Sequence, residues 1–350
     1  MLHEVWSFVD AERRAGRPVV LARLVGRDGP GARPLGATMA VAAGGAWRGS
    51  LSGGCVEGIV LDAAAAVLDG APPRLELVSP GEHLMPWEDA PACAGQLRVL
   101  VTPVPPATVC TAITAALARD EPLAVRVALH PPYLWSTAAT IDELDGTGAF
   151  VEQLPQRQRL ILVGATDLAA TLAELAGPLR RRVIIIDPRP GHLGSGAFPA
   201  GAETVPAWPD DWMVRHPLRA SDAVVVLSHD PRIDDRGIRA ALSGGAGHIA
   251  ALGSRATHRQ RLRRLDGLPG LERLVAPAGL DLGGSSPADT ALSILAGIVA
   301  TGNGRSGGLL RDTDAPIRAV PAPNVLKPAW RALPVHPSAG TSPRETDAVC

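Results

Sequence analysis

Short apolar stretches alternate with helical stretches in the second half of the chain, and this order restricts the fold more than any other feature. Strand-like stretches lie at 160–163, 183–187, 223–227 and 248–252, with helical patterns at 168–176, 255–265 and 287–300. Parallel strands need long crossover connections, which helices usually supply. The alternation therefore predicts a doubly wound parallel sheet in an α/β domain.

A degenerate dinucleotide fingerprint follows the first of these strands. The pattern G-x-G-x-x-G/A falls here on Gly164, Thr166 and Ala169. Asp187 ends the next strand 23 residues after Gly164, where dinucleotide sites place an acid that binds a ribose hydroxyl. Thr166 sets a branched side chain where pyrophosphate approaches the backbone, and Asp167 can cap the helix and repel a phosphate. The sequence predicts a Rossmann-like fold in which Gly164 and Asp187 are candidate nucleotide contacts but tight NAD(P) binding is disfavoured.

Further polar residues lie at the carboxyl ends of later strands, where ligands of open α/β sheets bind. Two clusters are candidates, Ser228-His229-Asp230 and Gly253-Ser254-Arg255. The second is a candidate phosphate site at a helix start, with Arg255 supplying charge. His229 has an equally weighted alternative as a hydrogen-bonded structural histidine. The later arginines of that helix are interpreted as a solvated face, namely Arg259, Arg261, Arg263 and Arg264.

The N-terminal region has a mixed pattern that predicts an α+β domain. Helical patterns cover 2–15 and 56–68, and strand-like stretches lie at 18–25, 37–43, 75–78 and 97–104, with another short strand carrying Trp47. Gly44-Gly45 indicates a hairpin turn between two of these strands. The domain boundaries are placed at 1–105 and 158–302, with a connecting segment at 106–157 and a Gly/Pro/Ser-rich, mostly unstructured tail at 303–350.

A glycine-rich loop in the N-terminal region carries a cysteine at the start of a helical run. Its sequence is Gly49-Ser50-Leu51-Ser52-Gly53-Gly54-Cys55-Val56-Glu57-Gly58. The first N–H groups of a helix lack partners and attract anions, and the same field lowers a cysteine pKa. Gly53 and Gly54 let a ligand approach the backbone. Two interpretations stay open: Cys55 is a reactive or ligand-binding thiol beside an anion cradle, or a buried structural cysteine in a tight turn.

A second thiol, Cys93, lies in the small-residue turn 91–96 of the same predicted domain. The two thiols can converge on one ligand, and the alternative is that Cys93 is a buried small hydrophobe. Cys110 lies in a helical run and is predicted to belong to the core, whereas Cys350 ends the chain. Because no cysteines form a C-x-x-C pair, a cysteine-rich zinc site is not expected.

Composition excludes several classes of function. The 350-residue chain carries 34 basic and 35 acidic residues and a net charge of −1, so nucleic-acid binding is not expected. Lys327, the only lysine, lies in the tail, which removes Schiff-base and P-loop lysine chemistry from the folded part. No secretory signal or bilayer-spanning run is present, and a reduced, cytoplasmic protein is expected.

Together these stretches resemble the XdhC/CoxI family of accessory factors for molybdenum hydroxylases. The resemblance covers most of residues 1–302, and its most specific part is Arg33-Pro34 followed by the Cys55 loop. Cys93 with Gly95 resembles the family's Cys-Gly-Gly element. In the second domain the matching motifs are 227–231, 251–255 and 278–283, in the family's order. Thr166, Asp167 and Ala94 depart from the pattern, the first two where the family has glycine and histidine.

The resemblance implies a protein that binds molybdenum cofactor as cargo, supports its sulfuration and hands it to an apo-hydroxylase of the xanthine dehydrogenase or CO dehydrogenase type. It further implies an N-terminal cofactor domain, a C-terminal Rossmann domain, homodimerisation and a cysteine desulfurase as a partner.

On this basis roles are assigned to residues of the first domain. Cys55 contacts molybdenum or carries sulfur as a persulfide, and Cys93 is a second sulfur-handling group. Donors to the anionic cofactor are assigned to Ser50, Ser52, Gly53 and Gly54. Arg33 pairs with its phosphate, and Glu57 caps the helix start, orients the loop or moves a proton. The alternatives are an NAD(P)-dependent oxidoreductase that uses the second domain and a non-catalytic scaffold for a hydroxylase.

Overall fold

The computed structural model describes residues 1–29, 33–54, 56–79, 95–194, 198–315 and 317, and the backbone of 325–326 and 336–337. The chain forms two compact units, one from residues 1–156 with 321–350 and the other from residues 157–320. No helix of the described part is both long and apolar enough to cross a membrane.

Unit 1 is built on a six-stranded sheet with the order β16-β4-β5-β1-β2-β3. All neighbouring pairs are antiparallel except β16 with β4. The strands are β1 (Val19–Asp28), β2 (Thr38–Ala42), β3 (Trp47–Gly49), β4 (Arg74–Val78), β5 (Gln96–Pro103) and β16 (His336–Pro337). The hairpin predicted at Gly44-Gly45 is confirmed, since β2 and β3 pair across it.

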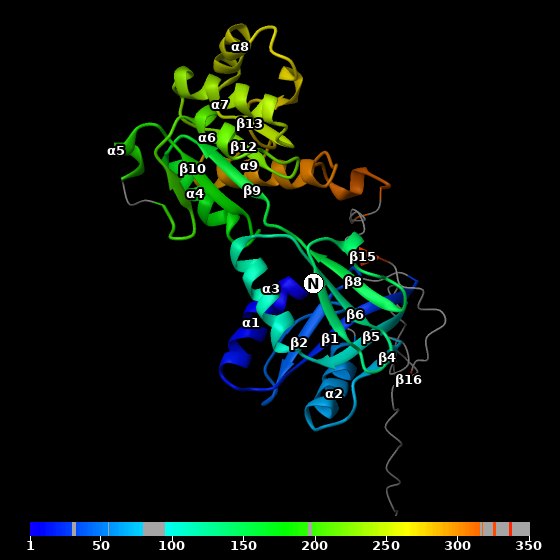
Figure 1. The fold of residues 1–350 in the computed structure, drawn as a ribbon. Coiled ribbons are helices and arrows are strands. Elements are labelled where there is room, and N and C mark those ends of the chain that lie inside the picture. The colour runs from blue at the N-terminus through cyan, green and yellow to red at the C-terminus, as the bar shows by residue number, and fades with distance from the viewer. Residues whose placement is uncertain are drawn as a thin grey trace, which may run out of the picture. The chain divides into compact units, whose positions relative to one another are not determined.

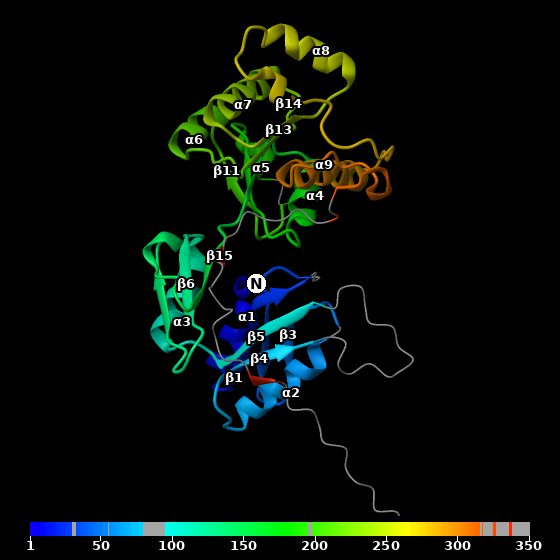
Figure 2. The same ribbon diagram turned by 90° about the vertical axis from the view of Figure 1, so that its right-hand side faces the viewer.

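Helices cover both faces of this sheet. Helix α2 (Glu57–Leu68) packs on one face, where its Val60 and Val67 meet the side chains of β1 and β5 (Figure 2). Helices α1 (Leu2–Arg14) and α3 (Ala107–Arg119) pack on the other face, around a core that includes Trp6 and Cys110. Side chains alternate between the faces of a strand, so β1 contributes apolar residues to both cores.

Residues 106–156 fold as part of unit 1. They supply α3 and most of a second sheet with the order β15-β8-β6-β7. Its strands are β6 (Leu123–Ala128), β7 (Trp135–Ala138), β8 (Ala149–Leu154) and β15 (Val325–Leu326), and the 3₁₀ turn η1 (Ile141–Glu143) lies between β7 and β8. A connecting segment was expected here because the Pro131-Pro132 break interrupts the pattern. Both prolines lie in the turn between β6 and β7, and the apolar positions on either side of it pair as strands.

Unit 2 contains a six-stranded parallel sheet with the order β11-β10-β9-β12-β13-β14. The strands are β9 (Arg159–Val163), β10 (Arg182–Ile186), β11 (Glu203–Val205), β12 (Ala223–Val226), β13 (His248–Ala251) and β14 (Leu274–Val275). The order reverses between β9 and β12, as in doubly wound folds that bind ligands at this switch point. The predicted Rossmann-like parallel sheet is therefore confirmed.

The helices of unit 2 form two layers around the sheet (Figure 1). Leu160 and Leu162 of β9 face a core shared with α4 and α9, whereas Ile161 and Val163 face a core shared with α6 and α7. The helices are α4 (Asp167–Ala176), α5 (Pro190–Leu193), α6 (Pro209–Arg215), α7 (Pro231–Gly244), α8 (Arg255–Arg264) and α9 (Pro287–Gly302), with 3₁₀ turns η2 (Leu271–Arg273) and η3 (Leu310–Asp312). Burial on both faces explains why the central strands are continuous apolar runs.

Candidate functional site

Glu57 closes the glycine-rich loop between β3 and α2. It is the first residue of α2 and is only 8% exposed. Its carboxylate accepts hydrogen bonds from both hydroxyls of the loop, with Ser50 Oγ at 2.6 Å and Ser52 Oγ at 2.7 Å. Main-chain N–H groups also donate to it, from Leu51, Ser52, Gly53, Gly54 and Val56 at 2.9–3.2 Å. The anion cradle expected from the sequence therefore holds the protein's own carboxylate.

The electrostatics of the cradle fix the charge of Glu57. Burial alone would raise the pKa of Glu57, but hydrogen bonds from Ser50, Ser52 and Leu51 hold it far below the ordinary value of a glutamate. Glu57 is consequently ionised at neutral pH, which suits a residue that orients the loop better than one that moves protons. The donors assigned to the cofactor from the sequence are engaged with Glu57.

The loop is anchored at both ends and open at its tip. Leu51 and Val56 are each 1% exposed and belong to the core beneath α2. Gly53 and Gly54 are exposed, with φ of +94° and +131°, and apart from their chain neighbours no atom of the described residues lies within 4 Å of the position where a Cβ would stand. Because residues other than glycine rarely adopt such backbone φ values, these two positions favour glycine. The backbone at the tip is therefore open to an approaching ligand.

The two candidate thiols, Cys55 and Cys93, lie outside the described residues. The prediction for Cys110 is confirmed: it is fully buried and its Sγ lies 3.1 Å from the Pro105 carbonyl oxygen. Burial raises the pKa of the Cys110 thiol, as expected for an unreactive core cysteine. Within the part of the chain that the structure describes, no three His, Cys, Asp or Glu residues gather as a metal-binding group.

Arg33 is paired within the protein. Its Nη2 donates to Glu4 Oε2 at 2.5 Å, and the same oxygen accepts from the Met1 amino group at 2.8 Å. The Arg33 side chain is about one-third exposed, at 32%. Its assignment to a cofactor phosphate stays a prediction and requires exchange with Glu4.

The carboxyl ends of β9 and β12 are in direct contact at the switch point of unit 2. A Cβ on Gly164 would lie 2.6 Å from the Ser228 main-chain nitrogen, and Gly164 has a φ of +114°. A side chain is thus excluded at Gly164 by both space and backbone conformation. The close contact with Ser228 and the positive φ therefore account for the first glycine of the fingerprint without a bound nucleotide.

Asp187 is clamped by its neighbours. The side chain is fully buried, with Ala165 N donating to Oδ2 at 2.8 Å. Arg189 binds both carboxylate oxygens, Oδ1 through N and Nε at 2.9 Å and Oδ2 through Nη2 at 2.8 Å. Burial would raise the pKa of Asp187, but these hydrogen bonds from Arg189 and Ala165 lower it. A ribose hydroxyl would have to displace them.

The cap of the helix that follows differs from the expectation. Thr166 is the N-cap of α4, and its Oγ1 accepts from Ala169 N at 3.2 Å. Asp167 is the first residue inside the helix, so its carboxylate is not the cap. The branched residue that replaces the second glycine is used for capping, which Ser and Thr hydroxyls favour.

We expect wild-type protein to give no saturable heat when titrated with NAD⁺ up to about 1 mM, the upper end of usual enzyme affinities. The clamped Asp187 and the capping Thr166 leave neither contact of the fingerprint available. Arg189→Ala, which removes the guanidinium from both carboxylate oxygens of Asp187, is expected to bind NAD⁺ more tightly than wild type. A micromolar Kd for the wild type would contradict this expectation.

A buried ionic network lies under the Ser228 cluster. Ser228 Oγ donates to Asp234 Oδ1 at 2.6 Å, and Arg261 Nη2 donates to Asp234 Oδ2 at 3.2 Å and to the Leu252 carbonyl at 3.0 Å. Burial raises the pKa of Asp234. Arg261 is 1% exposed, so the interpretation of its helix as a wholly solvated arginine face is wrong at this position. Buried Leu265 stands one turn after Arg261, and this spacing was the available signal.

Two of the remaining candidate residues of unit 2, Asp230 and Ser254, cap the N-termini of helices. Asp230 caps α7 by accepting from Arg232 N at 2.9 Å, and the Arg232 guanidinium lowers the pKa of Asp230 to about 2. His229 is exposed with a φ of +59°. Ser254 caps α8 by accepting from Thr257 N at 3.1 Å, behind Gly253, whose φ is +135°, and Arg255 is exposed. The residues that sequence reasoning missed are Arg189, Asp234 and Arg261.

Comparison with known proteins gives consistent matches. The chain is 32% identical to a probable xanthine dehydrogenase subunit of Bacillus subtilis over 155 residues, which are 44% of this chain and 46% of that relative, less than half its length. It is 27% identical to "Molybdenum cofactor insertion chaperone PaoD" of Escherichia coli over 81% of this chain and 83% of PaoD. A crystal structure described as a xanthine dehydrogenase from Bacillus halodurans has the same fold, with a TM-score of 0.71, 21% identity, and coverage of 86% of this chain and 96% of that one.

Two family models match separate parts of the chain. The model of the XdhC and CoxI family matches residues 12–79, which include the loop closed by Glu57. The model of the XdhC Rossmann domain matches residues 160–298, which form the parallel sheet and its helices. The chain therefore belongs to the XdhC and CoxI family.

Proposed function

We propose that this protein is an accessory factor for the maturation of a molybdenum hydroxylase of the xanthine dehydrogenase type. It receives molybdenum cofactor as cargo, supports its sulfuration and delivers it to the apo-hydroxylase. Family membership and the name of the Escherichia coli relative, a molybdenum cofactor insertion chaperone, support the accessory role.

The single observation that supports the cargo site best is the loop closed by Glu57. Its glycine tip is exposed, while Leu51 and Val56 anchor its base in the core. A ligand site gains precision when its supporting shell is fixed before binding. We place the contact with the cargo at Cys55, the residue after Gly54.

Cys55 supplies a soft sulfur ligand or a sulfur carrier at this tip. As a ligand it contacts the molybdenum centre directly. As a carrier, its thiolate attacks the terminal sulfur of a persulfide on a cysteine desulfurase, which yields a Cys55 persulfide and the desulfurase thiolate. Cys93 is proposed as a second sulfur-handling residue, and Glu57 as a positioning residue that keeps the loop in shape.

The same proposal includes a homodimeric assembly in the cytoplasm. The roles of Ser50 and Ser52 are then indirect, since their hydroxyls hold the carboxylate that shapes the loop. Gly53 and Gly54 act by leaving space for the cargo.

Cys55→Ala is expected to abolish most of the activation of apo-xanthine dehydrogenase, because the sulfur that meets the cargo is removed. The measurement is bound molybdopterin in the purified protein, together with hydroxylase activity after reconstitution. Cys110→Ala is the control, since that buried thiol faces the core and should leave activation unchanged. Wild-type cofactor content and activation in Cys55→Ala would remove Cys55 from the mechanism.

A further inference from the structure

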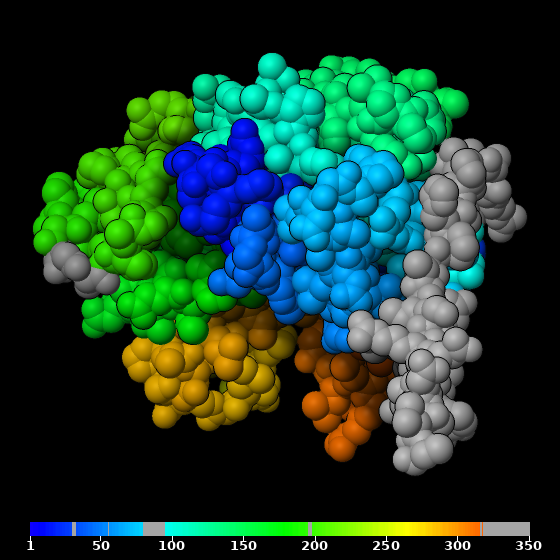
Figure 3. Space-filling view, turned by 90° about the horizontal axis from the view of Figure 1, so that it is seen from below, coloured from blue at the N-terminus to red at the C-terminus, as the bar shows by residue number. Residues whose placement is uncertain are grey.

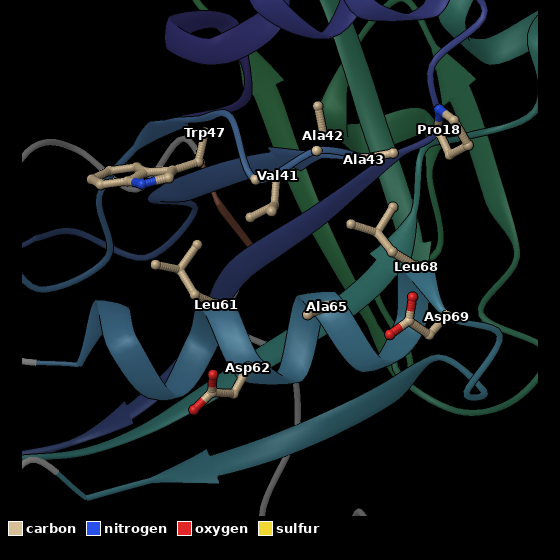
Figure 4. Close-up of a pocket in the computed structure, with 12 residues that line it drawn as sticks. Pro18, Val41, Ala42, Ala43, Trp47, Leu61, Asp62, Ala65, Leu68 and Asp69 are labelled. Carbon is tan, nitrogen blue, oxygen red and sulfur yellow. The ribbon is translucent and has the colours of Figure 1, made fainter.

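Helix α2 leaves part of its sheet uncovered. An α-helix is about 10 Å wide and covers roughly two strands spaced about 4.8 Å apart. Here α2 lies mainly over β1 and β5 and contacts β2 less, so among the described residues the corner formed by β2 and β3 is left partly open beside it. The result is a trough of about 460 Å³ between the helix and the hairpin (Figure 4).

The walls of the trough are apolar. Val41 and Trp47 are cross-strand neighbours on the hairpin side, and Leu61 and Leu68 line the helix side, with Ala65 between them (Figure 4). Trp47 is 41% exposed. The segment containing α2, in light blue, forms part of the outer surface of the protein (Figure 3). Val41 is buried and Leu61 and Leu68 are half-buried, so Trp47 and Ala65 are the exposed apolar residues among these five.

Among the described residues that line the trough, the charged ones are both acidic, Asp62 and Asp69. Neither has an ion-pair partner in the described part of the chain. They stand seven residues apart on α2, hence about 10 Å along the helix axis. Asp69 also follows the last turn of α2, where the helix carbonyls add negative potential and the helix itself carries no basic residue. The trough therefore repels an anionic cofactor and attracts cationic side chains.

We propose that this trough is the docking groove for a basic segment of the client hydroxylase, in which apolar side chains alternate with arginine or lysine. The apolar part fills the space between Val41 and Leu68, a guanidinium or ammonium group packs on Trp47, and the carboxylates bind the cations. This inference rests on the proposed function, because it takes the hydroxylase as the partner.

The position of the trough on α2 favours this occupant. Glu57, which closes the loop at the proposed cargo site, begins the same helix whose next turns line the trough. Leu61 lies only about 6 Å from Glu57 along the helix axis. A hydroxylase bound in the trough therefore lies beside the loop at the proposed cargo site. Its basic segment pairs with the carboxylates of Asp62 and Asp69.

Binding of purified apo-hydroxylase from the same organism to the immobilised full chain tests the inference. Trp47→Ala is expected to weaken binding about 10- to 100-fold, as for an aromatic anchor. Asp62→Asn/Asp69→Asn should weaken it about tenfold at low salt and less at high salt. Asp142→Asn/Asp266→Asn, an equal charge change at exposed positions, is the control. Bound molybdopterin should be unchanged in all variants.

The outcomes separate this inference from the function on which it rests. Equal binding by wild type and both trough variants overturns the docking groove and leaves the proposed function standing. Failure of the wild type to bind any apo-hydroxylase overturns both. A photo-cross-linker at exposed Ala65 gives a second measurement that does not depend on variant stability. The cross-linked hydroxylase peptide should contain arginine or lysine, and a peptide without either would contradict the proposed chemistry.

Discussion

Arg23→Ala is expected to lower the free energy of unfolding of unit 1 by about 3–5 kcal/mol, because it leaves a buried carboxylate without its partner. Arg23 of β1 and Glu152 of β8 are both fully buried and form an ion pair that joins the two sheets of unit 1. The guanidinium also lies over the rings of Trp135 and Phe150, at 5.5 Å and 5.0 Å. Urea unfolding monitored by tryptophan fluorescence measures the loss.

Two comparisons distinguish this ion pair from ordinary surface charges. Arg119→Ala removes an exposed arginine that pairs with exposed Glu121, and should change stability by less than about 1 kcal/mol. Arg23→Met/Glu152→Met replaces both charges with apolar side chains and should recover much of the lost stability. If Arg23→Ala lowered the free energy of unfolding no more than Arg119→Ala does, the Arg23–Glu152 ion pair would not stabilise the packing of the two sheets.

Glu57→Gln is expected to destabilise unit 1 by roughly 2–4 kcal/mol at pH 7, since it removes a charged acceptor of several hydrogen bonds. The pKa of Glu57 is depressed in the folded state, so the stabilisation by its carboxylate is present above the ordinary value of 4.5 and is lost as pH falls below it. The stability gap between wild type and variant should therefore be constant from neutral pH to about pH 5 and narrow in more acidic solution. Denaturant unfolding at a series of pH values measures this gap.

The same variant should alter the loop as well as the stability. Once the Ser50 and Ser52 hydroxyls lose their charged acceptor, the Gly53-Gly54 tip should exchange its amide hydrogens faster. Glu143→Gln, an exposed glutamate elsewhere in unit 1, is the matched control. If the difference in the free energy of unfolding between wild type and Glu57→Gln did not change with pH, the Glu57 carboxylate would not be the group that stabilises the loop.

The sheet of unit 2 could be predicted because its central strands are continuous apolar runs, as at Leu160–Val163 and Val183–Ile186. Strands buried on both faces carry this signal in the sequence itself. The edge strands β11 and β14 carry only three and two residues, too few for any period to show. The strands of residues 123–154 were missed for a related reason, since turn residues separate them at short intervals.

The junction between the glycine-rich loop and α2 could be predicted, whereas the contacts of Glu57 could not. The order of Ser50, the glycines and Glu57 marks a loop that becomes a helix, and the structure places these residues together. That the Glu57 side chain turns back into the loop depends on three-dimensional closure rather than on any local pattern. Arg261 is similar, because α8 has almost no apolar residues and an arginine has to face the interior.

Unit 2 is inserted within unit 1 along the chain. Residues 157–320 form unit 2, and Val325–Leu326 and His336–Pro337 return to pair with β8 and β4 of unit 1. The polypeptide thus passes between the units twice. A single proteolytic cut in the first crossing leaves the returning strands covalently attached to unit 2 and still paired with unit 1. Limited digestion there should therefore give two fragments on a denaturing gel that elute together from a native sizing column.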